Sequence, residues 1–395
     1  MKIMLVNSLY YPFKVGGAEV SVQLLAEGLV KHGCDVMVVT LTNDRMRHLT
    51  TEYINKVKVV RVYLKNIYWP FDEKDNRGSI KKLVWHIIDS YNPLMQKIVN
   101  KLVNDFSPDI IHTNNICGFS TSIWNKYDKI KVIHTIRDYY LLTPSSVLSD
   151  NKKLTAIDIA LSWIKKKRIS RVSCFIGISE YILKTHNDHG FFSGNEYLRK
   201  IYNSAILTDS FYLNKSKSKS KSKSGIFTIG FIGRLTEEKG YSIFYALADH
   251  YKNNKRIVFK AAGSGREDYL DELKCKYSGV NLYEMGHTSQ SEFYNEIDLL
   301  IIPAKWAEPF GRTAIEAFSY AVPVLSSGRG GLLEINSILK QDIYKDFQDL
   351  IKKVDALIEN NPSVDKSMVS EFNEHFSEKR YISQHLKLYS FLCNK

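Results

Sequence analysis

The sequence predicts an α/β protein built from two domains. Its 395 residues are enough for two or three domains that each bury a core, and 44% of them are hydrophobic, as in globular proteins. Short apolar runs alternate with stretches of helical periodicity, which is the pattern of open α/β sheets. Residues 215–224 alternate lysine with serine and have no apolar side chain to bury, so they mark a boundary between the two halves.

The first half shows the alternation from its first residues. Apolar runs predict strands at residues 2–7, 36–41, 57–63, 131–135 and 174–178. Helical spacing follows Gly17 until Gly33, continues over 83–106 with a break at Pro93, and returns over 157–169 and after Ser179, a residue suited to an N-cap. The aromatic and polar stretch 67–78 reads as a long loop, for which acceptor contact and surface packing are both open.

Glycines or polar side chains follow two of the predicted strands of this half. Gly16 and Gly17, with Glu19 behind them, open the first helix, where backbone amides can approach a phosphate or a polar sugar. A strand ending near His112 carries Asn114 just beyond it. Because the carboxyl ends of parallel strands share one edge of the sheet, we expect these groups to face a ligand; a tight turn between strand and helix is the less favoured explanation of the glycines.

The second half repeats the pattern. Strands are predicted at 227–232, 257–262, 280–283, 299–303 and 322–325, with helices at 267–276, 289–296 and 344–359. Arg234 and Lys239 follow the first of these strands, where a helix begins. Their charges add to that of the helix N-terminus, so a diphosphate is the natural ligand. After Glu334 no further strand is visible before the last helices.

The densest motif is the strand, loop, helix, strand and glycine turn of residues 299–331. Glu308 lies in the loop ahead of Pro309, Phe310 and Gly311, and Glu316 lies in the helix that follows. This order of elements is a ligand-site pattern of open α/β sheets, in which crevices form beyond the carboxyl ends of the strands.

These motifs resemble the Glu-x7-Glu signature and the Arg-x4-Lys pair of retaining glycosyltransferases of the GT-B fold, family 4, and the resemblance covers nearly the whole chain. It implies two Rossmann-like, doubly wound domains that face each other across a cleft: an acceptor-binding domain over 1–205, a hinge over 206–224, a nucleotide-sugar domain over 225–375, and a final helix, 376–395, that crosses back to the first domain.

The resemblance also implies a role for each matching residue. Arg234 and Lys239, with Gly16 and Gly17, would hold the donor diphosphate, and Glu308 with residues 309–311 would hold the donor sugar beside the reacting carbon. Glu316 would hold the ribose. His112, Asn114 and Glu19 would lie on the acceptor side.

One position departs from the family pattern. Many members carry a histidine before the aspartate of the loop that follows residues 131–135, whereas here Arg137 precedes Asp138. An arginine can grip an oxygen or a phosphate but cannot act as a base. We expect Arg137 and Asp138 to face the reacting centre, and the change, together with the short segment after Glu334, leaves open a GT-B-like binding protein with weak or no catalysis.

Composition narrows the remaining choices. No Asp-x-Asp or clustered histidines indicate a metal site, so no metal cofactor is expected and the diphosphate charge would fall to the basic side chains. A two-carboxylate glycoside hydrolase is a rival, but it would have no diphosphate for Arg234 and Lys239 to hold. Five scattered cysteines, no secretory leader and no long apolar run indicate a cytoplasmic protein.

The net charge of +13 is the last feature to explain. No aromatic and basic motif of a nucleic-acid reader is present, so nucleic acid is not an expected partner. The clusters Lys81-Lys82 and 165–168 could meet anionic lipid head groups on the inner face of the cell membrane, or simply be solvated. The expected partners are thus a nucleotide sugar, a glycan or lipid-linked acceptor, and an anionic membrane surface.

Overall fold

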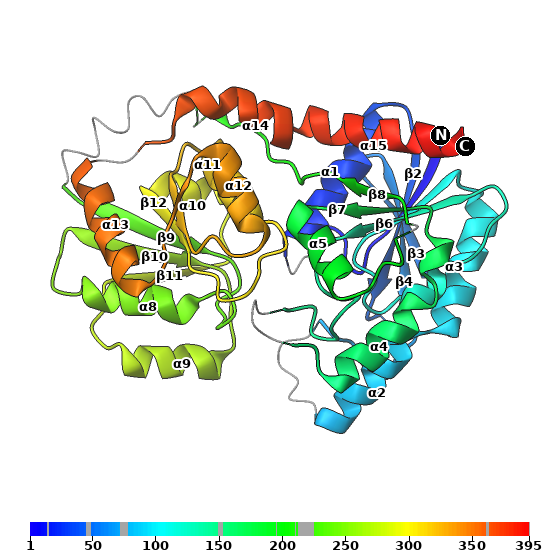
Figure 1. The fold of residues 1–395 in the computed structure, drawn as a ribbon, viewed down its shortest axis with the longest axis horizontal. Coiled ribbons are helices and arrows are strands. Elements are labelled where there is room, and N and C mark those ends of the chain that lie inside the picture. The colour runs from blue at the N-terminus through cyan, green and yellow to red at the C-terminus, as the bar shows by residue number, and fades with distance from the viewer. Residues whose placement is uncertain are drawn as a thin grey trace. The chain divides into compact units, whose positions relative to one another are not determined.

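The computed structural model describes all residues except 14–15, 45–48, 72–77, 149–152, 195, 210, 212–224, 361–362 and 395. It divides into two compact units (Figure 1): unit 1 comprises Met1–Asn203 with Glu378–Lys395, and unit 2 comprises Ser204–Ser377. The Lys/Ser stretch expected as the hinge lies outside the described residues. Of the expected hinge, Phe211 belongs to unit 2, where its ring packs against Phe318.

An eight-stranded sheet forms the centre of unit 1. Its strand order is β3-β4-β2-β1-β5-β6-β7-β8, and all neighbours are parallel except β3 and β4. The chain winds away from β1 on one side and from β5 on the other, so the switch point of this sheet lies between them. The strands are β1 (Lys2–Val6), β2 (Asp35–Thr42), β3 (Leu49–Ile54), β4 (Val57–Tyr63), β5 (Ile110–Thr113), β6 (Lys131–Ile136), β7 (Cys174–Gly177) and β8 (Leu198–Lys200).

The helices of unit 1 begin where the sequence supplies caps. Pro93 occupies the first turn of its helix, and the Asn92 side chain accepts a hydrogen bond from the Met95 N–H at 3.1 Å. Ser179 caps as expected by accepting from the Ile182 N–H. The helices are α1 (Gly17–Lys31), α2 (Ser79–Ser90), α3 (Pro93–Phe106), α4 (Ala156–Lys166), α5 (Glu180–Asp188) and α15 (Glu378–Cys393), with short 3₁₀ turns at Thr121–Ile123 and Ile169–Arg171.

The last helix, α15, packs on unit 1, as the GT-B fold predicts (Figure 1). Tyr381, Ile382 and Tyr389 join the core formed by β1, β2 and α1. Gly28 of α1 makes the contact possible, because a Cβ there would lie 2.4 Å from the Ile382 side chain. Any other residue at position 28 would push the two helices apart.

Unit 2 is built on a six-stranded sheet whose strands are all parallel, in the order β11-β10-β9-β12-β13-β14. The chain moves in opposite directions from β9 and from β12, which places the switch point between these neighbours. The strands are β9 (Phe227–Ile232), β10 (Ile257–Ala262), β11 (Leu282–Gly286), β12 (Leu299–Ile302), β13 (Val324–Ser326) and β14 (Asp342–Ile343).

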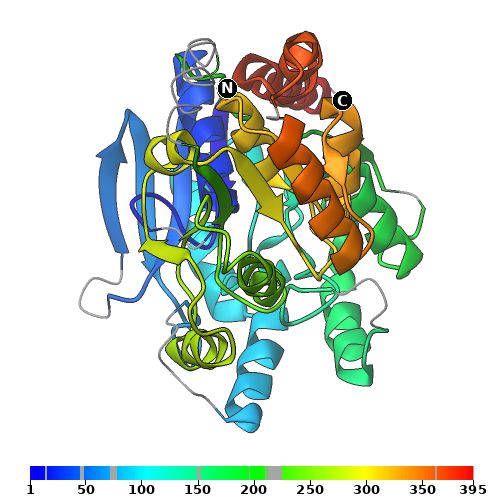
Figure 2. The same cartoon turned by 90° about the vertical axis from the view of Figure 1, so that its left-hand side faces the viewer.

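Helices cover both faces of this sheet, as Figure 1 and the turned view of Figure 2 show. Apolar side chains of β9, β10 and β12 form a core with α8, α9 and α13. The helices are α8 (Tyr241–His250), α9 (Glu267–Lys276), α10 (Gln290–Glu296), α11 (Arg312–Ser319), α12 (Gly331–Leu339), α13 (Phe347–Asn360) and α14 (Val369–Phe376), with a 3₁₀ turn at Lys366–Met368.

Three strands escaped the sequence prediction. The expectation that no strand follows Glu334 is wrong, because β14 pairs with β13 at the edge of the sheet. It has only two residues, both exposed, and therefore no apolar run. The edge strands β3 and β8 were missed for the same reason, since most of their side chains face solvent.

Candidate active site

The switch point of unit 2 brings two polar loops together. One loop follows β9 and leads into α8, and the other follows β12 and leads into α11. Gly240, at the start of α8, has φ 77°, and a Cβ on it would lie 1.8 Å from the Pro303 carbonyl oxygen. The two loops therefore touch through backbone, which only glycine permits at this position.

A buried ion pair lies where these loops meet. Lys239 Nζ is 2.5 Å from Glu308 Oε1, and the side chains are only 24% and 10% exposed. The Trp306 indole N–H donates to the same oxygen at 2.9 Å, and Lys239 Nζ stands 4.7 Å from the centre of a Trp306 ring. Both contacts use Oε1 and neither uses Oε2. The sequence motifs placed Lys239 and Glu308 in one site, and the structure brings them into direct contact.

The backbone of Glu308 is fixed by the glycine turn that precedes α12. Its carbonyl accepts a hydrogen bond from the Gly331 N–H at 2.7 Å, and Glu308 and Gly330 form a parallel bridge. A Cβ on Gly330, whose φ is 66°, would lie 2.4 Å from the Glu308 carbonyl oxygen. The start of α12 is thus held against the Glu308 backbone, and the helix N-terminus adds partial positive charge to this loop.

Glu316 lies in α11, one turn after the first residue of the helix, Arg312. Arg312 Nε donates to its Oε1 at 2.6 Å, and the Tyr294 hydroxyl lies 3.4 Å from its Oε2. The carboxylate is 8% exposed, so it is an oriented acceptor rather than a solvated surface acid.

Arg234 differs from Lys239 in exposure. Its guanidinium is 39% exposed and lies 3.5 Å from Glu238 Oε1. A partly exposed i,i+4 ion pair at this distance holds a side chain weakly, so Arg234 can turn to an incoming anion.

The residues between the two acids include a core side chain and a glycine turn. The Phe310 side chain is 2% exposed and packs against Phe376, so it belongs to the core of unit 2, and the sugar contact of residues 309–311 stays a prediction. Gly311 takes a left-handed conformation with φ 102° at the N-cap of α11. Its place in the motif is explained by this turn, because Pro309 and Phe310 must lead directly into the helix.

At the switch point of unit 1, the backbone amide of Gly16 is already hydrogen-bonded within the protein. Gly16 is the N-cap of α1, and its N–H donates to Glu19 Oε2 at 3.0 Å. Glu19 is 6% exposed and thus caps its own helix. The amide expected to approach a ligand is occupied by this carboxylate, and Gly17 is the first residue of the helix.

Arg137 is the centre of a buried network. Its Nε donates to Asn114 Oδ1 at 2.9 Å, its Nη1 to Asn203 Oδ1 at 2.8 Å, and its Nη2 to the Tyr381 hydroxyl at 3.2 Å. These partners come from the end of β5, the last residues of unit 1 before unit 2, and α15. With 7% exposure, Arg137 ties three segments together, whereas the sequence predicted that it faces the reacting centre.

His112 is a core residue, which corrects its expected acceptor-side role. It is fully buried, with Nδ1 2.6 Å from the Tyr389 hydroxyl and Nε2 2.7 Å from Thr135 Oγ1. Burial, reinforced by His385 and Arg137 nearby, holds its pKa well below the ordinary value. A strand end alone does not tell which face of the sheet a side chain points to.

Beneath the loop that follows β6 lies a charged group that the sequence did not reveal. Asp138 Oδ1 accepts from the Tyr140 N–H at 2.8 Å, and the Lys165 ammonium donates to the Tyr140 carbonyl and lies 3.7 Å from its ring centre. Asp89 accepts from the Gly118 N–H at 2.6 Å. Burial raises the Asp89 pKa to about 7 and lowers the Lys165 pKa to about 8. The signal was the spacing of Lys165, one turn from the buried Leu161, which sets it apart from the rest of the basic run.

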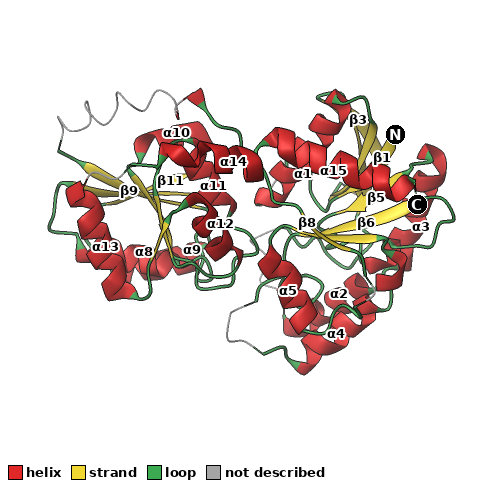
Figure 3. Cartoon of the chain, turned by 45° about the horizontal axis from the view of Figure 1, so that its top comes forward, coloured by secondary structure: helices red, strands yellow, loops and turns green. Residues whose placement is uncertain are grey.

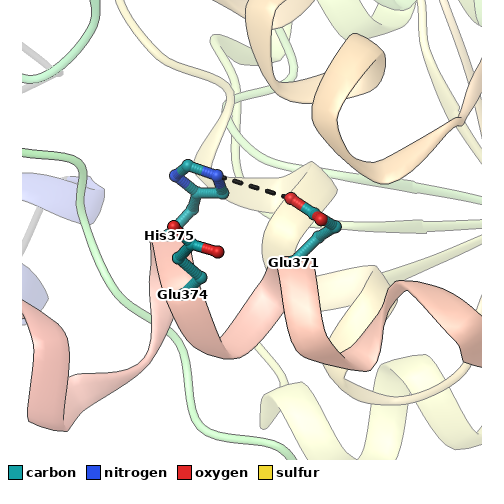
Figure 4. A group of neighbouring side chains, drawn as sticks. All are labelled: Glu371, Glu374 and His375. Carbon is teal, nitrogen blue, oxygen red and sulfur yellow. Dashed lines mark ion pairs between the residues drawn. The ribbon is translucent and has the colours of Figure 1, made fainter.

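One group of potential metal ligands appears on α14, where the sequence had indicated none. Glu371, Glu374 and His375 lie on one face of the helix with ligand atoms within 4.8 Å of one another (Figure 4). His375 Nε2 is 3.5 Å from Glu371 Oε2. This grouping follows from i, i+3 and i+4 spacing on a helix, and Glu374 is exposed, so it does not by itself define a metal site.

Two units of parallel sheet and flanking helices, each with polar residues gathered at its switch point and joined by a returning C-terminal helix, define a protein of the GT-B class. The family model described as Glycosyltransferase Family 4 matches residues 15–203, and that described as Glycosyl transferases group 1 matches residues 214–379. The chain belongs to the GT-B glycosyltransferases of this group 1, family 4 type.

Individual relatives agree with the family models. An uncharacterized 42.6 kDa protein in the cps region of Klebsiella pneumoniae is 38% identical over 391 residues, which cover 97% of this chain and 99% of that protein. Two solved structures share the fold: sucrose-phosphate synthase from Thermosynechococcus elongatus has a TM-score of 0.77 at 17% identity, covering 99% and 98% of the two chains. Anabaena HepE, in complex with UDP and glucose, has a TM-score of 0.68 at 16% identity and 99% coverage of both.

Within the described residues, no helix combines the length and the apolar character that crossing a membrane requires.

Proposed function

We propose that this glycosyltransferase moves a sugar from a nucleotide-diphosphate sugar to a glycan or lipid-linked acceptor in surface polysaccharide synthesis, with retention of the anomeric configuration and without a metal ion. Two finer parts of this proposal, the donor class and the chemistry, rest on the groups at the switch point of unit 2. The acceptor class rests on the cps region from which the Klebsiella relative comes.

The contact between Lys239 and Glu308 is the observation that carries the proposal. A transferase that breaks a sugar–diphosphate bond must neutralise charge on the leaving diphosphate and orient the sugar at the same time. Lys239 is a partly buried cation for the first task, and the neighbouring Oε2 of Glu308 is an acceptor for sugar hydroxyls. The ion pair thus places the cation for the diphosphate and the acceptor for the sugar within hydrogen-bond distance of each other before any ligand binds.

Arg234 would supply the second positive charge. Its exposed guanidinium can leave Glu238 and close on the diphosphate in a bidentate contact. Glu316, oriented by Arg312 and Tyr294, would accept from the ribose. Fixed cations of this kind are the reason for proposing a reaction independent of a metal.

The role proposed for Arg137 changes with its contacts. Since three of its N–H groups are directed at Asn114, Asn203 and Tyr381, we assign it a positioning role for the ends of β5 and β6. Asp138, in the same loop, is the residue of this pair that we retain as a candidate for the reaction. We place the protein in the cytoplasm, with peripheral association to the inner face of the membrane where lipid-linked acceptors would lie.

A second candidate function is binding of a nucleotide sugar or glycan without efficient turnover. The closed Arg137 network favours it, because the position that precedes Asp138 offers no base and few spare donors. Slow hydrolysis of the donor in water distinguishes the two, since an enzyme of this type cleaves the sugar–phosphate bond at a measurable rate and a binder does not.

The test begins with a thermal-shift panel of nucleotide-diphosphate sugars, because a ligand of the folded state raises the melting temperature. The stabilising donor is then supplied with glycan acceptors, and NMR of the product reports the anomeric configuration. Activity that survives a chelator and yields the donor's configuration supports the proposal. An inverted product, or activity that a chelator abolishes and Mg²⁺ restores, overturns its mechanistic part.

A further inference from the structure

Helix α2 turns its apolar side outward. Four apolar residues with i, i+3, i+4 and i+7 spacing are exposed: Ile80 by 81%, Leu83 by 38%, Val84 by 41% and Ile87 by 50%. The opposite side is buried and carries Trp85 and Asp89. A surface helix of a soluble protein normally places its apolar stripe on the core, so this inverted stripe calls for a partner.

Helix α4 shows the same inversion. Ile159 and Trp163, one turn apart, are 57% and 59% exposed, whereas Leu161 and Lys165 are buried. Lys165 uses its place in the interior to reach Tyr140. A lysine inside and a tryptophan outside reverse the usual preference of both residue types.

The two helices lie side by side in Figures 1 and 3, and contacts between their residues join them. Their ends are also linked, because the Arg168 guanidinium, just after α4, donates to the Tyr91 hydroxyl, just after α2, at 2.9 Å. The exposed apolar residues of both helices therefore belong to one region of unit 1. We call it the α2–α4 face, defined by Ile80, Leu83, Val84, Ile87, Ile159 and Trp163.

Basic residues accompany the apolar residues of both helices. Lys81 and Lys82 are exposed on α2, and Lys167 lies with its Nζ 3.6 Å from the ring centre of Trp163. The only acids in the two helices are Asp89, which is buried, and Asp158, which accepts hydrogen bonds from Thr155 at the start of α4. The charge that the face presents is positive.

We propose that the α2–α4 face docks on the surface of an anionic lipid bilayer. The apolar residues would enter the boundary between head groups and acyl chains, Trp163 would lie at the level of the head groups, and Lys81, Lys82 and Lys167 would meet lipid phosphates. An amphipathic surface with tryptophan on its apolar side and lysines beside it has the composition of an interfacial helix.

This proposal deepens the peripheral association stated above and names its surface. It does not depend on catalysis, because vesicle binding is measured without donor or acceptor. A failure here would leave the donor-induced thermal shift unchanged, so the two proposals can fail separately.

Co-sedimentation of the full chain with vesicles of phosphatidylcholine, with and without phosphatidylglycerol, tests the proposal. We expect binding to the anionic vesicles only. Lys81→Ala/Lys82→Ala should weaken the partition constant by about thirtyfold, at about 1 kcal/mol for each lysine near an anionic surface. Trp163→Glu should weaken it by about tenfold or more, because a carboxylate would replace the side chain at the interface.

Two matched variants control for exposure and charge. Tyr283, on β11 of unit 2, is 59% exposed like Trp163, and Tyr283→Glu should leave vesicle binding unchanged. Lys126 and Lys129 are exposed in unit 1 away from both helices, and their double alanine variant removes the same charge as the Lys81/Lys82 variant. Thermal melts of all four variants establish that they fold.

Three outcomes would overturn the proposal. The first is equal binding to neutral and anionic vesicles, and the second is an equal loss in the control and test variants. The third is self-association that Trp163→Glu abolishes in the absence of vesicle binding, which would assign the face to a second copy of the chain.

Discussion

The ion pair at the switch point of unit 2 gives two substitutions opposite effects on the binding of a nucleoside diphosphate. In the free protein Lys239 is neutralised by Glu308 at 2.5 Å. Lys239→Met removes the cation that the phosphates need. Glu308→Gln keeps an oxygen that can accept from Trp306 but releases Lys239 from its partner, so the phosphates no longer compete with a carboxylate.

The magnitudes follow from the geometry. A hydrogen bond to a charged group contributes about 1.5–3 kcal/mol, so Lys239→Met should weaken binding by about 10- to 150-fold. The pair is only partly shielded from water, and releasing Lys239 should tighten binding by about 1 kcal/mol, or about fivefold. Glu308→Gln should nevertheless lose turnover, since the carboxylate that orients the sugar is gone.

Calorimetric titration with the nucleoside diphosphate of the preferred donor measures these constants, and Lys239→Arg is the control that keeps the charge. Each variant is first checked by thermal melting, because Lys239→Met leaves a mostly buried carboxylate with Trp306 as its remaining contact in this cluster. Weakening of similar size in both variants would refute the reasoning, and so would an unchanged dissociation constant for Lys239→Met.

Three further predictions concern other parts of the chain. Gly330→Ala places a Cβ 2.4 Å from the Glu308 carbonyl oxygen at φ 66°, so turnover should fall about tenfold or more. The control Gly279→Ala is also at positive φ but has open space around its Cβ, so it should lower stability without this loss of turnover. Equal activities of the two variants would contradict the prediction. Arg137→Lys loses the planar fork that joins three partners and should lower the free energy of unfolding by about 1–3 kcal/mol, measured by urea titration of each transition; an unaltered midpoint would argue against the network. His134 is buried, and burial lowers its pKa to about 3, so the unfolded chain binds a proton below its own pKa of about 6.5 while the folded chain does not. The contribution of His134 to stability is therefore complete above that value and is lost on acidification, by about 2 kcal/mol between about pH 7 and about pH 5. His134→Gln should make the unfolding free energy fall less steeply over this range.

The sequence was sufficient for most of the architecture because buried parallel strands are apolar runs and their helices carry a regular stripe. β10 and α9 begin and end at the predicted residues. It failed where a strand is short and exposed, as in β14, because two residues show no periodicity.

The candidate site was predictable to the extent that its residues lie in motifs that directly follow strands of one sheet. Lys239 and Glu308 were placed together because each follows a strand of the same sheet, and neighbouring strand ends share an edge. The contacts of Arg137 could not be foreseen, since Asn203 and Tyr381 are distant in sequence and no local pattern records such pairing. His112 was misplaced because a fully buried strand gives no alternation from which to tell its two faces.

A crystal structure of the protein with an intact nucleotide-diphosphate sugar, or an unreactive analogue of one, tests the central claim most directly. We predict the β-phosphate within hydrogen-bond distance of Lys239 Nζ and the Arg234 guanidinium, a sugar hydroxyl on Glu308, and a ribose hydroxyl on Glu316. A diphosphate bound elsewhere, with Lys239 still paired to Glu308 and remote from it, would contradict the proposed site.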